Sequence, residues 1–265
     1  MPDEQHVPPR ELTETESAAI DWAGLLANLG KKVLHVGGGP STEQLLELAH
    51  LEPDQHVLDA GCGVGTTAIE IAQRFGCQVT AVDIAPSVIE RAATNVRAAG
   101  LQDSVTVHQG DILELEFSDD TFDRVIIESV VMFVDRAQAA REVVRVCKPG
   151  GLVIDHEAYF TRGAPDEIIQ SSQELFPGFG LEEPEGWVGL YRNAGLSDIE
   201  YVSGPAEFIG PGYIIRDEGL SGFLTILGRL LTHPTYLRQM AGMLPRVRRV
   251  QPYIDYIVLA GRKPA

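Results

Sequence analysis

The sequence predicts an α/β protein with a doubly wound, mostly parallel sheet. From residue 56 onward, short apolar and β-branched runs alternate with amphipathic helical patterns, as is typical of strands joined by crossover helices. The first of these strands is followed by "GCGVG", with glycine at every second position where the strand must turn into a helix. A length of 265 residues suits one large domain with an elaborated end.

The segment before the first strand is predicted to be helical. Residues 12–29 place apolar side chains at helical spacing, and Gly30 is a plausible C-cap. After the loop "VLHVGGGP", the run "STEQLLELAHL" predicts a second helix with Ser41 or Thr42 as its N-cap. We therefore expect residues 1–54 to form an N-terminal helical cap.

The core is predicted over residues 55–204. Its expected strands are "HVLDA", "QVTAVDI", "VTVHQGD", "FDRVIIES", "LVIDHEAY" and "IEYVSG", in chain order. Between them lie the helical patterns "TTAIEIAQRFG", "PSVIERAATNVRAAG" and "RAQAAREVVRVC", followed by the turn "KPGG". Two more helices are expected at 165–175 and 185–194. Residues 251–265 supply a seventh strand, "YIDYIVLAGRK".

Residues 205–250 form a predicted insertion before that last strand. Its sequence is apolar at helical spacing and carries several arginines, whereas the chain as a whole is acidic. One interpretation is a lid over a hydrophobic ligand, with arginines meeting an anionic group or a lipid surface. The other is an amphipathic helical pair packed on the sheet edge, with its arginines solvated or paired.

The glycines predict a ligand site. In an open α/β sheet, ligands bind beyond the carboxyl ends of the strands, so Gly61, Gly63 and Gly65 leave bare backbone where a ligand can lie against it. Dinucleotide sites have G-x-G-x-x-G, but here the third glycine position is Thr66. Asp83 ends the next strand about 20 residues on, where a carboxylate can accept ribose hydroxyl hydrogen bonds.

Four motifs in this order resemble those of the class I S-adenosylmethionine (SAM)-dependent methyltransferases. They are "VLDAGCGVG", "AVDIA", "QGDI" and "VCKPGGLVI", and together they cover residues 55–157. The resemblance implies a Rossmann-like, seven-stranded sheet whose last strand is antiparallel, and SAM as the cofactor. By position, it implies cofactor binding by Asp59, Gly61, Cys62, Gly63, Gly65, Thr66, Asp83, Ile84, Gly110, Asp111, Ile112 and Glu128.

Methyl transfer needs alignment of the acceptor more than a dedicated base. The acceptor is expected above the ends of the fourth and fifth strands, where His156, Glu157 and Glu128 are candidate catalytic residues. Candidate substrate contacts are His35, Met132, Phe133 and Tyr159. The resemblance is to the small-molecule, ubiquinone/menaquinone-methyltransferase-like branch. An NAD-dependent oxidoreductase and a non-catalytic SAM-binding protein stay open as alternatives.

Charge and composition restrict the kinds of partner that the protein is expected to bind. The formal net charge is −17, which disfavours nucleic acid, so a small-molecule methyl acceptor is expected. Three scattered cysteines and scattered histidines predict neither disulfides nor a metal site. Membrane contact through 220–250 is the less favoured alternative. The acidic, proline-containing start is unlike a secretory signal, so a cytoplasmic protein is expected.

Overall fold

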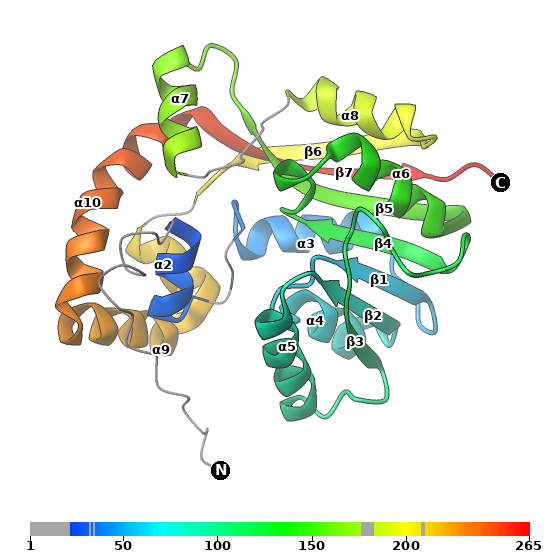
Figure 1. Ribbon diagram of the computed structural model, residues 1–265, viewed down its shortest axis with the longest axis horizontal. Helices are drawn as coiled ribbons and strands as arrows, with labels where there is room; N and C mark the ends of the chain where they lie inside the picture. The colour runs from blue at the N-terminus through cyan, green and yellow to red at the C-terminus, as the bar shows by residue number, and fades with distance from the viewer. Residues whose placement is uncertain (1–21, 32, 34, 176–182, 208–209) are drawn as a thin grey trace.

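Seven strands form one mixed sheet in the order β3-β2-β1-β4-β5-β7-β6. The computed structural model describes residues 22–31, 33, 35–175, 183–207 and 210–265 (Figure 1). β1 to β5 are parallel, whereas β7 runs antiparallel to both β5 and β6. The predicted fold, including the antiparallel last strand, is confirmed. The strands are β1 (His56–Ala60), β2 (Gln78–Asp83), β3 (Val105–Gln109), β4 (Phe122–Glu128), β5 (Cys147–Phe160), β6 (Ser197–Pro205) and β7 (Ile254–Arg262).

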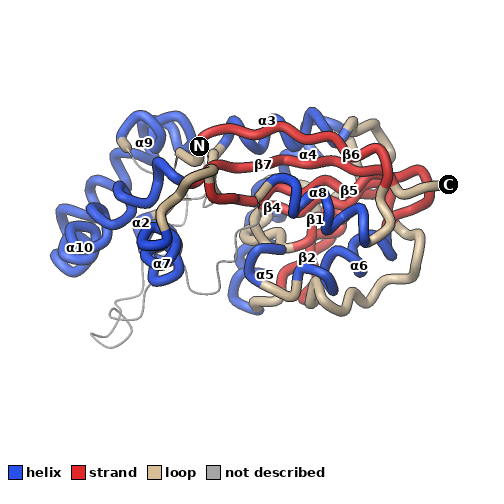
Figure 2. Tube along the Cα trace, turned by 90° about the horizontal axis from the view of Figure 1, so that it is seen from above, coloured by secondary structure: helices blue, strands red, loops and turns tan. Residues whose placement is uncertain are grey.

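Helices cover both faces of this sheet (Figure 2). The helices α3 (Gly39–Ala49), α4 (Thr66–Phe75) and α5 (Pro86–Ala98) pack on one face through a core that includes Ile126 of β4. The helices α6 (Arg136–Val146) and α8 (Pro184–Asn193) cover the other face, where the neighbouring strand residue Ile127 is buried. Strand side chains alternate between faces, so continuous apolar runs such as "VII" are buried on both sides.

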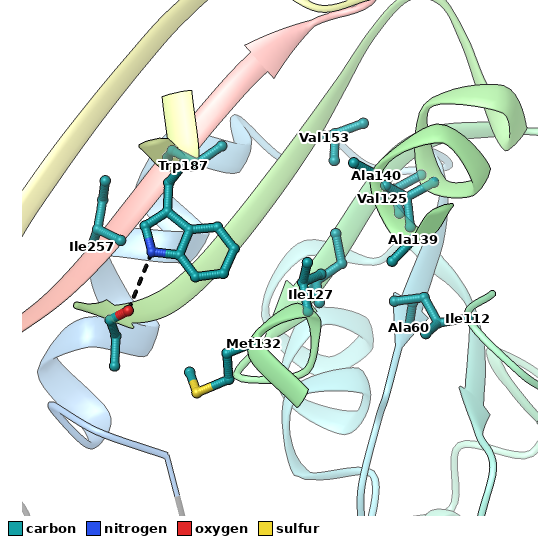
Figure 3. Close-up of a cluster of buried hydrophobic side chains, with 14 of the residues drawn as sticks. Ala60, Ile112, Val125, Ile127, Met132, Ala139, Ala140, Val153, Trp187 and Ile257 are labelled. Carbon is teal, nitrogen blue, oxygen red and sulfur yellow. Dashed lines mark hydrogen bonds between the residues drawn. The ribbon is translucent and has the colours of Figure 1, made fainter. Parts of the chain in front are cut away.

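Figure 3 shows the core on the α6 and α8 face. Ala139 and Ala140 of α6 lie close to the sheet, and the indole Nε1 of Trp187 donates a hydrogen bond to the Ala158 carbonyl oxygen at 3.2 Å. Trp187 is fully buried, so this bond satisfies its only polar atom. α8 is thereby fixed against β5.

A group of helices lies beyond the carboxyl ends of the parallel strands (Figure 1). They are α2 (Trp22–Leu29), α7 (Asp166–Leu175), α9 (Pro211–Thr232) and α10 (Pro234–Val250). The predicted insertion thus forms two helices packed on α2 and α7. No helix in the described ranges is long and apolar enough to cross a bilayer. The division into a cap (1–54), a core (55–204), a lid (205–250) and a last strand (251–265) stays a prediction.

Two local predictions differ from the structure, and the predicted residues 12–21 lie outside the described ones. The N-cap of α3 is Gly38 rather than Ser41 or Thr42. The Ser41 hydroxyl instead donates to the Gly38 carbonyl oxygen at 2.8 Å. The Thr42 hydroxyl donates to Glu128 at the end of β4. The "KPGG" turn is an irregularity within β5, since Phe122 pairs with Cys147 while Arg124 pairs with Leu152.

Candidate cofactor and catalytic site

The three loop glycines have different surroundings. Gly61 (φ +86°) lies against Val130, and a Cβ on Gly61 would overlap that side chain. Gly65 is the N-cap of α4 and packs on Ala92 of α5. A Cβ on Gly63 (φ +53°) would meet no described atom within 4 Å. Gly63 is therefore the glycine whose bare backbone faces open space.

The ends of β2 and β3 place two carboxylates beside this loop. Asp83 accepts hydrogen bonds from the backbone N–H groups of Gly63 and Ala85, each at 3.0 Å. Asp111 follows β3 and accepts one from the Leu113 N–H at 2.9 Å. Between them, Ile84 is 63% exposed. Two hydrogen-bond acceptors flanking an uncovered apolar side chain suit a nucleoside, whose ribose donates hydrogen bonds and whose base is flat and apolar on its faces.

Asp59 lies under the loop and is almost completely buried. Its side chain is 2% exposed, and its Oδ2 has no hydrogen-bond partner among the described residues. Burial, followed by the negative charge of Glu128, raises the pKa of Asp59 to about 8. The group is therefore neutral at pH 7 without a cation nearby. Burial also raises the pKa of the neighbouring Cys62, so its thiol is not a nucleophile.

A buried polar cluster forms at the end of β4 around Glu128. Its Oε1 accepts a hydrogen bond from the Thr42 hydroxyl of α3 at 2.7 Å, and its Oε2 accepts one from the Thr67 hydroxyl of α4 at 2.9 Å. His35 Nε2 lies 3.2 Å from Oε1. Burial opposes ionisation, but interactions with the nearby imidazole rings of His35 and His156 and the two hydroxyl hydrogen bonds leave the pKa of Glu128 below its usual value. Glu128 is a carboxylate.

The two histidines of this cluster lie in different surroundings. Both ring nitrogens of His35 face acceptors, since Nδ1 lies 3.2 Å from the Val36 carbonyl oxygen and Nε2 faces Glu128. The Thr42 hydroxyl also lies 3.2 Å from His35 Nε2, so His35, Thr42 and Glu128 form one hydrogen-bonded group. His156 is fully buried, its ring centroid is 5.1 Å from that of His35, and its Nδ1 lies 3.1 Å from the Ser129 hydroxyl. Burial, with the charge of His35, lowers the pKa of His156 to about 3, so it is neutral.

Glu157 faces the opposite side of β5 from His156. Its Oε1 accepts hydrogen bonds from the N–H groups of Val130 (3.1 Å) and Val131 (2.7 Å). Burial, followed by the charge of Asp155, raises the pKa of Glu157. Asp155 lies on the same face and accepts a hydrogen bond from the Tyr191 hydroxyl at 2.7 Å. Glu157 is fully buried and anchors the turn that packs on Gly61.

Sequence comparison assigns the family. A methyltransferase-domain family model matches residues 57–151. Methyltransferase GfsG of Streptomyces halstedii is 34% identical over 215 residues, which are 75% of this chain and 77% of that protein. The chain belongs to the class I SAM-dependent methyltransferases. SAM is therefore the cofactor, and the ubiquinone/menaquinone-like branch stays a prediction.

The chain is also similar to two further proteins. An uncharacterized protein of Haemophilus influenzae is 31% identical over 206 residues, which are 76% of this chain and 82% of that protein. The structure of Haemonchus contortus phosphoethanolamine N-methyltransferase 2 with phosphomonomethylethanolamine and S-adenosylhomocysteine has a TM-score of 0.72 at 22% identity. The alignment covers 92% of this chain and 58% of that one, and at this low identity it shows the fold alone.

In this methyltransferase the remaining candidate residues lie in several parts of the structure, some in the core and some at the surface. Ile112 and Met132 are 7% and 2% exposed and belong to the core of Figure 3. Phe133 is 48% exposed, at the end of the short 3₁₀ helix η1 (Val131–Phe133). Tyr159 lines a separate cavity of about 340 Å³ beside the N-terminus of α8. Thr66 is exposed, whereas its neighbour Thr67 is buried against Glu128. Gly110 donates its N–H to the Asp83 carbonyl oxygen at 3.1 Å.

Sequence reasoning missed Thr42, Thr67 and Tyr256 as members of this site. Tyr256 of β7 stacks at 5.6 Å on His156 from a segment 100 positions away along the chain. Thr42 was assigned to a helix cap, and nothing local distinguishes a capping hydroxyl from one that binds a distant carboxylate. For Thr67 a signal existed, because it follows the glycine loop within the first turn of α4.

Proposed function

We propose that the protein transfers the methyl group of SAM to a small-molecule acceptor by in-line displacement, with the adenosyl group lying across Gly63, Asp83 and Ile84. The observation that carries this proposal is the open space over Gly63, next to a fixed carboxylate and an apolar side chain that is 63% exposed. A nucleoside over this surface would cover Ile84 and offer its ribose hydroxyls to Asp83. Asp111 would accept a hydrogen bond from the exocyclic amine of the base.

The methionine part of SAM is assigned to the loop and to Asp59. A sulfonium and an ammonium group bring positive charge toward a buried carboxyl whose Oδ2 has no described partner. Glu128, ionised and about 10% exposed, adds negative charge at the same end of the sheet. Opposite charges in a site of low dielectric attract strongly, which favours a cationic ligand here.

The candidate bases do not act as bases in this arrangement. Glu128 is held by the hydroxyls of Thr42 and Thr67, whereas His156 is buried with its pKa lowered to about 3. Glu157 is held by backbone N–H groups on the other face. We therefore assign His35 and Glu128 to closing the N-terminal segment over the site. Alignment in a dry pocket, which can contribute about 7–11 kcal/mol, then drives the transfer.

This assignment restricts the acceptor. A nucleophile that needs no base is either neutral with a free lone pair or ionised in solution, as in amines, thiols of low pKa and acidic hydroxyls. The net charge of −17 opposes a nucleic-acid acceptor. The apolar helices of 205–250 beyond the strand ends support a lid over a small and hydrophobic acceptor.

Calorimetric binding and turnover test the proposal together. SAM and S-adenosylhomocysteine are titrated into the protein, and labelled SAM is incubated with panels of amines, thiols, phenols and quinols. Asp83→Ala should weaken SAM binding at least tenfold, because it loses a charge-assisted hydrogen-bond pair. The matched control is Asp103→Ala, which removes an exposed carboxylate from the same half of the sheet.

Two outcomes would contradict it. Equal SAM affinity in Asp83→Ala would remove the cofactor assignment. Tight SAM binding with no S-adenosylhomocysteine produced from any acceptor class would indicate a non-catalytic SAM-binding protein. A base-free mechanism further requires that His156→Gln keeps the wild-type pH profile of kcat/KM.

A further inference from the structure

The second half of α9 carries an uncovered apolar stripe. Gly219 (φ +70°) interrupts the helix, and after it Leu220, Leu224, Leu227 and Leu231 are 63, 55, 39 and 71% exposed. At 100° per residue these four side chains lie within an arc of about 60°. The opposite side of the helix faces the protein, where Arg229 donates to the Asn28 carbonyl oxygen at 3.3 Å.

Exposed apolar side chains are concentrated in this region. Nine large hydrophobic side chains are exposed among the described residues, and six of them lie between residues 215 and 237. Two of the other three, Ile84 and Phe133, lie at the carboxyl ends of the strands. A cluster of this kind on an otherwise charged surface marks an interaction site.

The same helical pair is locally basic. From Gly219 to Val250 the sequence holds five arginines and no aspartate or glutamate, although the chain carries a formal charge of −17. α10 adds Leu237, which is 51% exposed, next to the exposed Arg238, and it presents the exposed Arg248 about three turns further along the helix. Both arginines are exposed, and neither forms an ion pair with any described residue.

We propose that this surface, formed by the α9 leucines with Leu237, Arg238 and Arg248, binds the face of an anionic lipid bilayer. Leucines enter the boundary between headgroups and acyl chains, and the arginines meet lipid phosphates. The helices lie on the bilayer, since no described helix can cross one. A symmetric pairing of two copies is disfavoured, because it would bring two basic surfaces together.

Vesicle flotation with the full chain tests the proposal. The probes are vesicles of pure phosphatidylcholine and vesicles of phosphatidylcholine with an equal amount of phosphatidylglycerol. The protein should float with the anionic vesicles, and less so at high ionic strength. Arg238→Gln with Arg248→Gln should weaken partitioning about 30-fold, while Arg141→Gln on α6, also exposed, should leave it unchanged.

A leucine variant separates insertion from charge. Leu224→Ser with Leu231→Ser should weaken binding about tenfold or more at every ionic strength. Tyr201→Ser, at a side chain 45% exposed on β6, is its control. Circular dichroism and SAM affinity should be unchanged in all variants, which keeps membrane binding separate from the proposed methyl transfer.

The proposal is overturned if the wild-type protein does not float with anionic vesicles, or if the arginine and leucine variants float as well as the wild type does. It is also overturned if light scattering shows a concentration-dependent dimer that Leu224→Ser with Leu231→Ser abolishes, without any vesicle binding. In that case the stripe is an interface between copies.

Discussion

At the scale of single residues, Gly61 and Gly63 carry out different tasks within one motif. Gly61→Ala places a Cβ into Val130, so it should lower the free energy of unfolding by about 2 kcal/mol or more. Gly63→Ala meets open space and should cost only the strain of a positive φ, about 1 kcal/mol. Its larger effect should be on SAM affinity, because the methyl group occupies the space assigned to the ligand.

Urea unfolding and SAM titration on both variants measure these effects. The expected pattern is a crossed one, with stability lost mainly in Gly61→Ala and affinity lost mainly in Gly63→Ala. If Gly63→Ala binds SAM as tightly as wild type, the ligand does not lie on that backbone.

Asp59 predicts a proton linked to cofactor binding. Its folded-state pKa of about 8 lies above the usual value of 3.8, so at pH 7 the folded protein holds a proton that the unfolded chain has lost. The contribution of Asp59 to stability is therefore complete below about pH 4 and is lost as the pH rises from 3.8 through 8. A cation bound nearby favours the ionised form, so SAM binding at pH 7 should release up to one proton.

Calorimetry in two buffers of different ionisation enthalpy measures that release. Asp59→Asn should remove the buffer dependence, and Asp198→Asn at an exposed position should keep it. A binding enthalpy that is the same in both buffers for the wild-type protein would show that Asp59 does not respond to the cofactor.

At the scale of elements, a buried ion pair joins α9 to the N-terminal segment. Lys31 Nζ lies 3.1 Å from Asp217 Oδ2 and 3.6 Å from Glu218 Oε1, and the three side chains are at most 3% exposed. Asp217 also accepts the Gly39 N–H at 3.2 Å, so the start of α3 is fixed as well. Lys31 is shared by the two carboxylates of Asp217 and Glu218, and we call this group of three residues the cap ion pair.

Removing the cation of the cap ion pair should be strongly destabilising. Lys31→Met removes the buried ammonium group that Asp217 and Glu218 share, although Arg216 stays 3.5 Å from Asp217. It should lower the free energy of unfolding by about 3–5 kcal/mol. Adding Asp217→Asn and Glu218→Gln to Lys31→Met should recover most of that loss. Arg74→Met is the control, because the Arg74–Glu43 pair is 42% and 52% exposed and should contribute little to the free energy of unfolding. Equal urea midpoints for Lys31→Met and Arg74→Met would contradict this account.

At the scale of the whole molecule, the sequence predicts the sheet better than the site. Strand ends place Asp83 and Asp111 side by side in any parallel sheet of this order, so spacing alone locates them. Alternation separates His156 from Glu157, but which of them faces α3 depends on helices far away in the chain. The contact of His35 with Glu128 joins residues 93 positions apart. It depends on the path of the loop before α3, which the cap ion pair fixes through Lys31 and the Gly39 N–H.

That loop path connects the cofactor loop to the outer helices. Glu128 holds His35, the Tyr213 hydroxyl of α9 lies 3.4 Å from the His35 carbonyl oxygen, and the cap ion pair follows one turn later. SAM bound over Gly63 should therefore slow amide hydrogen exchange in residues 35–42 and in 211–218. At a SAM concentration of 100 times the dissociation constant, binding stabilises the folded state by about 2.7 kcal/mol. The free energy of amide protection gained on binding should not exceed this value.

Hydrogen-exchange mass spectrometry with and without SAM tests this connection across the molecule. In the wild-type protein, protection should extend from the glycine loop to the first half of α9. In Lys31→Met, it should persist at 61–65 but disappear at 211–218, because the link between the two has been cut. If SAM leaves exchange in 211–218 unchanged in the wild-type protein, α9 is packed on the cap independently of the cofactor and does not act as its lid.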